Sequence, residues 1–383
     1  MPSKGVELIA TPEALDRLVV NINEARLAGR IDSCYLDTEA DSLHHYQEKL
    51  CLIQMCVDGQ VVLIDPLAEK RLEPLLEALD HLTVWFHGAD YDLTLLRRTY
   101  QWTPRELRDT QIAARLTGHR EFGLSALVGK HVGILLSKAS QKADWSRRPL
   151  PENMRAYAAE DVRHLPSLVN TLLSMLEKSG RTAWFLQSCE SLKNDVMGRG
   201  ERTKAEPWRV SGSGKLRPKG LAFLREAWTW REGVAADKDV PPFRIMNNQQ
   251  LIALAMEFEG QERVSLPPRW RHDWKQAIYQ AADRVKASAP DTWPQRPPKK
   301  MRHLPEVART RVDELCKARD QAALGLDLEP SLIGSRAVYE QIVYDHQEVK
   351  PDQLLMPWQM EIMRTYLDGK AATVLPLDAV SPA

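Results

Sequence analysis

The sequence predicts an α/β domain with a mixed sheet in its first half, followed by one or two small all-helical domains. Strand-like residues 50–57 and 60–65 flank Asp58-Gly59, a dipeptide typical of a tight hairpin turn. An apolar segment at 83–87 follows a helical pattern, which indicates a strand-helix-strand unit. In the second half the periodicity is helical, and prolines interrupt it.

Changes of period place the other elements of the first half. Thr11 is expected to cap a helix whose apolar residues recur at helical spacing. Residues 33–39 are short and strand-like, and the helical pattern before the strand at 83–87 covers 67–79. From Asp90 onward the segments look helical. Residues 33–39 and the two arms of the hairpin are therefore expected as three neighbouring strands of one sheet.

Length and composition indicate a multidomain protein without a membrane span. At 383 residues the chain is expected to form two or three domains. No apolar run approaches the ~18 residues of a membrane-spanning helix. The five scattered cysteines form no CxxC pair, so free thiols in a reducing compartment are expected rather than disulfides or a zinc site. Because the N-terminus has no secretory pattern, we expect a cytoplasmic protein. We also expect a monomer.

Charge is unevenly distributed along the chain. The net charge is zero, yet residues 201–302 carry 20 Lys and Arg against 12 Asp and Glu, an excess of eight positive charges. A basic middle region beside an acidic remainder suits a polyanion-binding module attached to a metal-dependent catalyst. Uneven solvated surfaces with no partner are the alternative.

Asp37 and Glu39 are the first candidate catalytic residues. Residues two apart on a strand face the same side, so this D-x-E places two carboxylates together beside apolar Tyr35 and Leu36. Two such charges repel each other unless a cation neutralises them. A lone D-x-E also occurs on solvated surfaces, so a metal site requires further acids to converge here.

Asp92 is the third candidate acid. It follows the apolar strand that ends at His87, where an α/β sheet typically opens its site. Asp90 lies in the same turn and is a rival, although it can equally act as a helix N-cap. We favour Asp92 because it begins the apolar helical run at 93–96.

Tyr157 and Asp161 complete the candidate set. The segment 155–165 has alanines, long polar side chains and no Gly or Pro, which favours a helix. Four residues apart, the phenol and the carboxylate share one helical face. Glu160 is rotated by roughly 100° from Asp161 on a helix and is therefore left out of the predicted metal site.

Taken in chain order, these four acids and the tyrosine resemble the motifs of the DEDD exonuclease superfamily in its tyrosine-bearing branch. Within that branch they resemble the ribonuclease D family. The resemblance covers roughly residues 8–180. Besides the acids and the tyrosine, it rests on four further segments: 86–93, 109–111, 123–127 and 144–150.

The resemblance implies a ribonuclease H-like exonuclease fold that holds two divalent cations, Mg²⁺ or Mn²⁺. Such hard cations prefer oxygen ligands. By analogy with the family, Asp37 bridges the two ions, Glu39 and Asp161 complete the first site, and Asp92 serves the second. Tyr157 is expected to orient the attacking water.

Candidate nucleic-acid contacts lie in both halves of the chain. In the first half they are His87, Trp145 and Arg147, and in the basic region they are Arg209, Lys215, Arg217 and Lys219. Arg147 and Arg148 beside Trp145 fit the aromatic-plus-cation pattern of single-strand binding, although a packing tryptophan with solvated arginines fits equally well. The basic residues are expected to hold phosphates without selecting a sequence.

The second half resembles the HRDC domain, a small helical module, through Trp208-Arg209 and Trp230-Arg231. We place the exonuclease domain at 1–195, the HRDC domain at 205–288, a Pro-rich linker at 289–304 and a second, diverged copy at 305–375. A repeat indicates this copy: Arg231, Ala235, Pro242 and Ile245 recur 88 positions later as Arg319, Ala323, Pro330 and Ile333. An unrelated helical tail is the alternative.

The expected function is metal-dependent 3′-to-5′ hydrolysis of RNA that releases 5′ mononucleotides. Its expected substrates are structured RNAs with a free 3′ end, such as tRNA precursors. The alternatives are a 3′-5′ DNA exonuclease and an inactive nucleic-acid-binding protein with an exonuclease fold.

Overall fold

The computed structural model describes residues 6–199, 205–262, 264–268, 270–296, 305–344 and 349–368. Chain contacts divide the protein into two units. Unit 1 contains Met1–Ala40, Leu50–Arg199 and His303–Ala383, and unit 2 contains Asp41–Lys49 and Gly200–Arg302. Within the described ranges, every helix is too short or too polar to cross a membrane.

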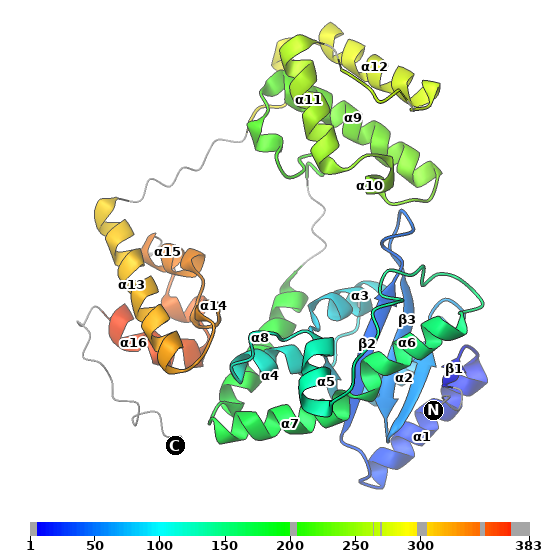
Figure 1. Ribbon diagram of the computed structural model, residues 1–383, viewed down its shortest axis with the longest axis vertical. Coiled ribbons are helices and arrows are strands. Elements are labelled where there is room, and N and C mark those ends of the chain that lie inside the picture. Colours follow the sequence, from blue (N-terminus) through cyan, green and yellow to red (C-terminus); the bar gives the residue numbers. More distant parts are fainter. Residues whose placement is uncertain are drawn as a thin grey trace. The chain divides into compact units, whose positions relative to one another are not determined.

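Unit 1 is built on a mixed six-stranded sheet (Figure 1). Its strands are β1 (Glu7–Ile9), β2 (Ser33–Ala40), β3 (Leu50–Val57), β4 (Gln60–Ile64), β5 (Thr83–Phe86) and β6 (Glu106–Asp109). Their order in the sheet is β1-β4-β3-β2-β5-β6. The β2-β3 and β3-β4 pairs are antiparallel, and the other three pairs are parallel. The predicted mixed sheet, its hairpin and its three neighbouring strands are confirmed.

Helices cover both faces of this sheet. One face packs against α1 (Pro12–Leu27), α2 (Glu73–Leu79) and α3 (Asp90–Tyr100). The other packs mainly against α4 (Thr110–Leu116), α5 (Leu124–Val132), α6 (Glu152–Arg163), α7 (Leu165–Lys178) and α8 (Thr182–Gly198). Side chains of β2 alternate between these two layers, so its odd-numbered residues face α6 and its neighbours.

The structure confirms one predicted helix start and corrects two predicted elements. The Thr11 hydroxyl accepts the backbone N–H of Ala14, as expected of an N-cap. The helix predicted to begin at residue 67 begins at Glu73, because the Asp65 carboxylate accepts the N–H groups of Leu67 and Ala68 and holds a turn there. The expectation of helices alone after Asp90 was also wrong, since β6 pairs with β5.

Four C-terminal elements complete unit 1: α13 (Glu306–Gly325), α14 (Pro330–Ile333), α15 (Arg336–Tyr344) and α16 (Pro357–Leu367). They pack against the exonuclease helices. Trp358 of α16 stacks on Trp184 of α8 with 4.9 Å between the ring centroids. Arg115 of α4 forms a 3.0 Å ion pair with Glu329. This C-terminal segment therefore shares a core with the preceding helices.

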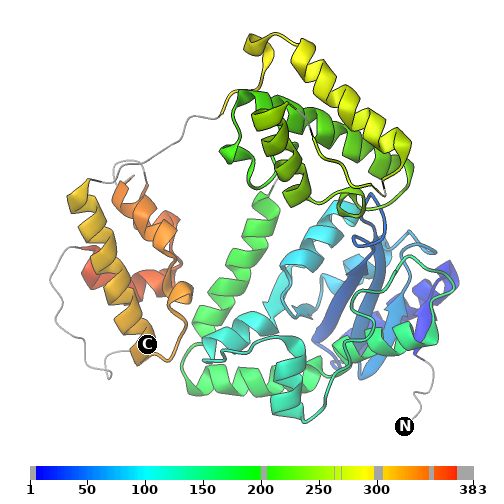
Figure 2. The same ribbon diagram turned by 45° about the horizontal axis from the view of Figure 1, so that its top comes forward.

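Unit 2 contains α9 (Pro218–Asp237), α10 (Pro242–Ile245), α11 (Asn248–Gln261) and α12 (His272–Ala287), coloured green to yellow in Figure 2. Its core includes Phe223 and Phe258, which stack with 4.6 Å between their centroids. The helical periodicity predicted for this part of the chain is confirmed by α9 and α11.

An arginine on the first helix of each C-terminal helical segment makes equivalent contacts. In α9, Arg231 donates to the carbonyl of Met246 and pairs with Glu232. In α13, Arg319 donates to the carbonyl of Gly334 and pairs with Asp320. Each residue of the second set follows its counterpart by 88 positions. This correspondence supports the proposal of a second, diverged copy over an unrelated helical tail.

Candidate active site

The two acids of the D-x-E motif lie on one face of β2. Asp37 and Glu39 point toward the layer that contains α6, whereas Thr38 between them points to the opposite face. Asp37 pairs in register with Gln54 of β3, and Glu39 pairs with Leu52. The central strands of the sheet therefore form the floor of the site.

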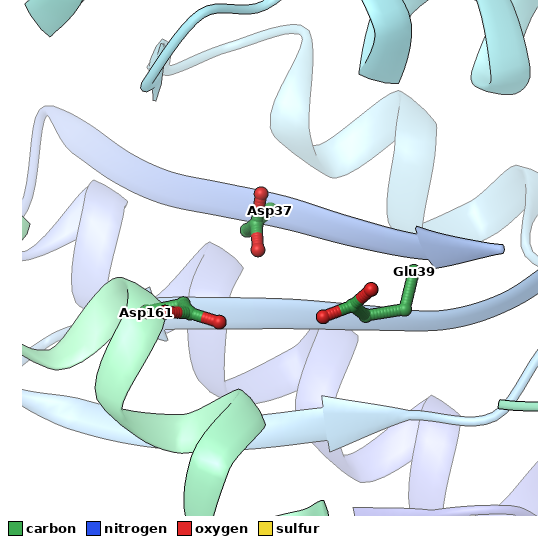
Figure 3. Close-up of side chains that lie close together, drawn as sticks. All are labelled: Asp37, Glu39 and Asp161. Carbon is green, nitrogen blue, oxygen red and sulfur yellow. The ribbon is translucent and has the colours of Figure 1, made fainter. Parts of the chain in front are cut away.

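Asp161 of α6 completes a cluster of three carboxylates. One oxygen of each of Asp37, Glu39 and Asp161 can be chosen so that all three lie within 4.8 Å of one another. Figure 3 shows Asp161 reaching from its helix toward the two acids of the strand. Three oxygen donors at this spacing fit a hard divalent cation such as Mg²⁺ or Mn²⁺.

Burial and mutual repulsion disfavour the charged forms of these acids. Burial, followed by the neighbouring acids, raises the pKa of Glu39 to about 10. Burial and the Asp37 charge raise the pKa of Asp161 to about 8. Burial raises the pKa of Asp37 to about 6. A bound cation would offset both effects, so the electrostatics fit a metal site as well as the donor atoms do.

Asp92 lies beside this cluster but outside the group of three. It is buried in the first turn of α3, and the Thr38 hydroxyl donates to its carboxylate at 2.5 Å. Burial and the Asp37 charge raise its pKa well above the ordinary value. The rival Asp90 is exposed and forms an ion pair with Arg199. Its side chain does not cap α3, which begins after Ala89.

Tyr157 lies one turn before Asp161 on the same face of α6. Burial raises the pKa of Asp161, and the neighbouring Tyr157 hydroxyl opposes this shift. Burial and the charges of Asp161, Glu39 and Asp37 raise the pKa of the phenol, so it remains protonated. Glu160 instead pairs with Arg163 and His164, and lies outside the carboxylate group as expected.

Asp109 is a positioning residue that the motif analysis named only as part of a structural stretch. Its buried carboxylate accepts the backbone N–H groups of Gly88, Ala89 and Gln111. It thus caps α4 and holds the turn that leads into α3 and Asp92. An aspartate between a strand and a helix was the available sequence signal.

The burial of Trp145 argues against its predicted contact with nucleic acid. It is only 1% exposed and packs among Leu52, Leu150 and Ala158, so it has no free face on which a base could stack. Arg148 is likewise structural, because it donates to both carboxylate oxygens of Asp65 and to the carbonyl of Cys51. Of the two alternatives for Trp145, the structure therefore supports packing in the core over stacking on a base.

The other first-half candidates retain polar groups for contacts. The side chain of Arg147 is exposed. The Nδ1 atom of His87 lies 2.9 Å from the Thr110 hydroxyl, and its buried Nε2 atom has no hydrogen-bond partner among the described residues. Both remain predictions as nucleic-acid contacts.

The basic candidates of unit 2 differ in how far they are engaged. Arg209 stacks over Trp208 and pairs with Glu206, and Lys219 pairs with Glu262. Lys215 is exposed. Arg217 is also exposed, although it pairs with Glu259 at 3.0 Å. Lys215 and Arg217 are therefore the more accessible of the four.

An aromatic hollow, missed by the sequence analysis, lies elsewhere on unit 2. Its volume is about 480 Å³, and its lining includes Phe243, Trp270, Arg271 and Trp274. Each of the two tryptophans lies about 6 Å, centroid to centroid, from the other and from Trp230. Phe243 is 51% exposed, and the Arg271 guanidinium pairs with Asp273. Aromatic rings beside a cation are the elements of a single-strand binding surface.

Comparison with known proteins agrees with the geometry. Residues 6–177 match the family model described as 3′-5′ exonuclease, and residues 220–258 match the HRDC domain model. Ribonuclease D of Zymomonas mobilis is 32% identical over 284 residues, which cover 71% of this chain and 72% of that protein. The chain belongs to the ribonuclease D family. It is accordingly a 3′-5′ exoribonuclease with an HRDC domain.

Other ribonuclease D relatives and solved structures extend this comparison. The enzyme of Gluconacetobacter diazotrophicus is 33% identical, with 65% of this chain and 62% of that protein aligned. The crystal structure of Escherichia coli RNase D has a TM-score of 0.70 at 24% identity, covering 96% of this chain and 98% of the other. A Bifidobacterium adolescentis protein has a TM-score of 0.77 at the same identity and coverage. These structural likenesses support the fold.

Proposed function

We propose that Asp37, Glu39, Asp92 and Asp161 form a two-cation centre at which this exoribonuclease hydrolyses RNA from the 3′ end. The convergence of Asp37, Glu39 and Asp161 within 4.8 Å is the observation that carries the proposal. Asp92, buried beside Asp37, is the candidate ligand of the second ion. Mg²⁺ and Mn²⁺ are the cations that suit an all-oxygen set.

In this proposal the protein supplies the ligands of the cations and positions the attacking water. Divalent cations would lower the pKa of a bound water and stabilise the departing 3′ oxygen. Asp37 is the candidate shared ligand, because its charge, after burial, raises the pKa of each of the other three acids. The Tyr157 hydroxyl, which lies beside Asp161, would orient the attacking water toward the phosphorus. Thr38 would hold Asp92 in place through its hydrogen bond to the carboxylate, and Asp109 would do so by holding the turn before α3.

Several surfaces are proposed to hold the RNA. His87 and Arg147 are candidates near the 3′ end, and Lys215 and Arg217 are candidate phosphate contacts. Arg209 and Lys219 would have to exchange their internal partners to contribute. The hollow around Phe243 and Trp274 offers a place for unpaired bases to stack.

The substrates are proposed to be structured RNAs with a free 3′ tail, including tRNA precursors. This proposal follows the E. coli enzyme, which is an exoribonuclease involved in structured RNA processing. We further propose that the protein is monomeric and cytoplasmic; all five of its cysteines are buried.

A tRNA precursor with a labelled 5′ end tests this proposal. With Mg²⁺ or Mn²⁺, the wild-type protein should shorten the 3′ trailer stepwise and release 5′ mononucleotides, and EDTA should stop the reaction. A matched DNA strand should be degraded more slowly. Internal cleavage, or equal degradation in EDTA, would refute the proposal, and faster digestion of DNA would favour the DNA exonuclease alternative.

A further inference from the structure

Gln54 is an exception in its strand. All eight residues of β3 are buried, and the other seven are Leu, Ile, Met, Val or Cys. Gln54 itself is 0% exposed. A strand buried on both faces ordinarily carries apolar side chains throughout, because an amide loses its water when it is buried. Packing alone therefore does not account for glutamine at this position.

The amide of Gln54 is also unsatisfied. Neither Oε1 nor Nε2 has a hydrogen-bond partner among the residues that the structure describes. Buried polar side chains in folded proteins nearly always have partners, and an exception often marks the place of a water or an ion. Within the described part of the chain, the fold thus leaves a buried donor and a buried acceptor unused.

The sheet register places Gln54 beside the acidic cluster. Gln54 is the direct antiparallel partner of Asp37, so the two side chains emerge on the same face of the sheet. Its neighbours Ile53 and Met55 belong to the core on the opposite face. The face that carries Gln54 is the one that α6 covers with Ala158, Ala159 and Asp161.

We propose that Gln54 is a positioning residue of the metal site. When cations are bound, its Nε2 group donates to the Asp37 carboxylate, and its Oε1 atom accepts a hydrogen bond from metal-bound water. The loaded site supplies an acceptor and a donor, which match the two unused groups of the amide. This inference rests on the proposed cation centre.

Hydrogen bonds of this kind orient metal ligands, and their loss typically lowers metal affinity by about 10–100-fold. In the metal-free protein the amide has no such partners and destabilises the fold. Gln54 should therefore have opposite effects in the two states: it lowers the stability of the metal-free protein and raises its affinity for cations. A residue that serves only the packing of the sheet would not produce this combination.

Gln54→Met tests the inference, because methionine has a similar shape and lacks the amide. Mn²⁺ affinity is measured by calorimetric titration of the full-length protein, and the thermal midpoint is measured in EDTA. We expect affinity to fall at least tenfold and the metal-free midpoint to rise by about 2–4 °C. Gln54→Leu should behave in the same way. Met55→Leu, on the opposite face of β3, is the control and should leave Mn²⁺ affinity unchanged.

Two other results separate the possible failures. If wild-type protein binds Mn²⁺ and Gln54→Met binds it equally well, the role of Gln54 is overturned and the cation centre stands. If the wild-type protein binds no Mn²⁺, both the cation centre and the inference are overturned.

Discussion

Tyr157 lies one turn before Asp161 on α6, where burial raises the pKa of the Asp161 carboxyl and the Tyr157 hydroxyl opposes that shift. Burial and the charges of Asp161, Glu39 and Asp37 raise the pKa of the phenol, which therefore lies on the face of the helix that meets these acids. A protonated hydroxyl in this position can orient a water molecule without binding a cation itself.

Tyr157→Phe should therefore reduce catalysis far more than cation binding. Because the variant keeps all four acids, we expect kcat to fall by about 100-fold while Mn²⁺ affinity changes by less than about threefold. Single-turnover hydrolysis and Mn²⁺ titration measure the two effects. Tyr100→Phe, a half-buried tyrosine elsewhere in unit 1, should retain wild-type kcat. An unchanged kcat in Tyr157→Phe would remove the proposed role of the tyrosine.

The stability of the metal-free protein should fall as pH rises. In the native state the pKa values of Asp37, Asp161 and Glu39 are raised to about 6, 8 and 10, against about 4 when unfolded. At a pH between the unfolded and native pKa values, the native state holds protons that the unfolded state has lost. The free energy of unfolding is therefore greatest at low pH and falls as the pH rises. Thermal midpoints in EDTA from pH 5 to 9 measure this dependence.

Two further measurements assign that pH dependence to the acidic cluster. Mn²⁺ should weaken the decline, because the cation favours the ionised carboxylates. Asp161→Asn should also have a shallower decline than wild type between pH 5 and 8. A metal-free midpoint that rises over this range in wild type would contradict the arrangement of buried acids.

Adjacent arginines should differ sharply in their effect on stability. Arg148 forms a 2.6 Å ion pair with the buried Asp65 carboxylate, so Arg148→Ala leaves a buried charge without its cation and should cost about 3–5 kcal/mol of unfolding free energy. Arg147 is exposed, and Arg147→Ala should stay within about 0.5 kcal/mol. The unfolding free energies of the two variants are compared by urea denaturation, using the first cooperative unfolding transition. Similar losses in both variants would be inconsistent with the structural role of Arg148.

The hollow of unit 2 should contribute to RNA affinity but not to the chemical step. Phe243→Ala with Arg271→Gln removes a stacking surface worth about 1–3 kcal/mol and one cation, so the Kd for RNA with a single-stranded tail should rise at least tenfold. Hydrolysis of a dinucleotide should be unchanged.

The matched control for the hollow is Tyr279→Ala with Arg284→Gln. Both residues are exposed on α12 outside the hollow, so the Kd should remain near wild type. Equal losses in the two double variants, measured by fluorescence anisotropy, would point to general charge and aromatic effects.

Local sequence patterns predicted much of the active site. Alternation along β2 paired Asp37 with Glu39, and helical spacing paired Tyr157 with Asp161. The convergence of strand and helix could not come from spacing alone, and it was expected only through the family resemblance. Short edge strands were missed because three or four residues carry little periodicity: β1 and β6 are recognisable only through their neighbours in the sheet.

Burial decides between the two alternatives for Trp145. Beside Arg147 and Arg148 it fitted either a single-strand surface or a packing role, because a sequence does not reveal whether an aromatic ring faces water or a core. Gln54 shows the converse, since a polar residue in an apolar strand had significance only once its unpaired amide and its register with Asp37 were known.

The most direct test of the account compares Asp161→Asn with Glu160→Gln, its immediate neighbour on α6. RNA with a labelled 5′ end is incubated with Mg²⁺ or Mn²⁺, and its 3′ shortening is followed on sequencing gels. We predict a loss of rate of at least 1,000-fold in Asp161→Asn, on the order of removing an essential catalytic group, and near wild-type shortening in Glu160→Gln. Full activity in Asp161→Asn, or an equal loss in both variants, would contradict the proposed carboxylate centre.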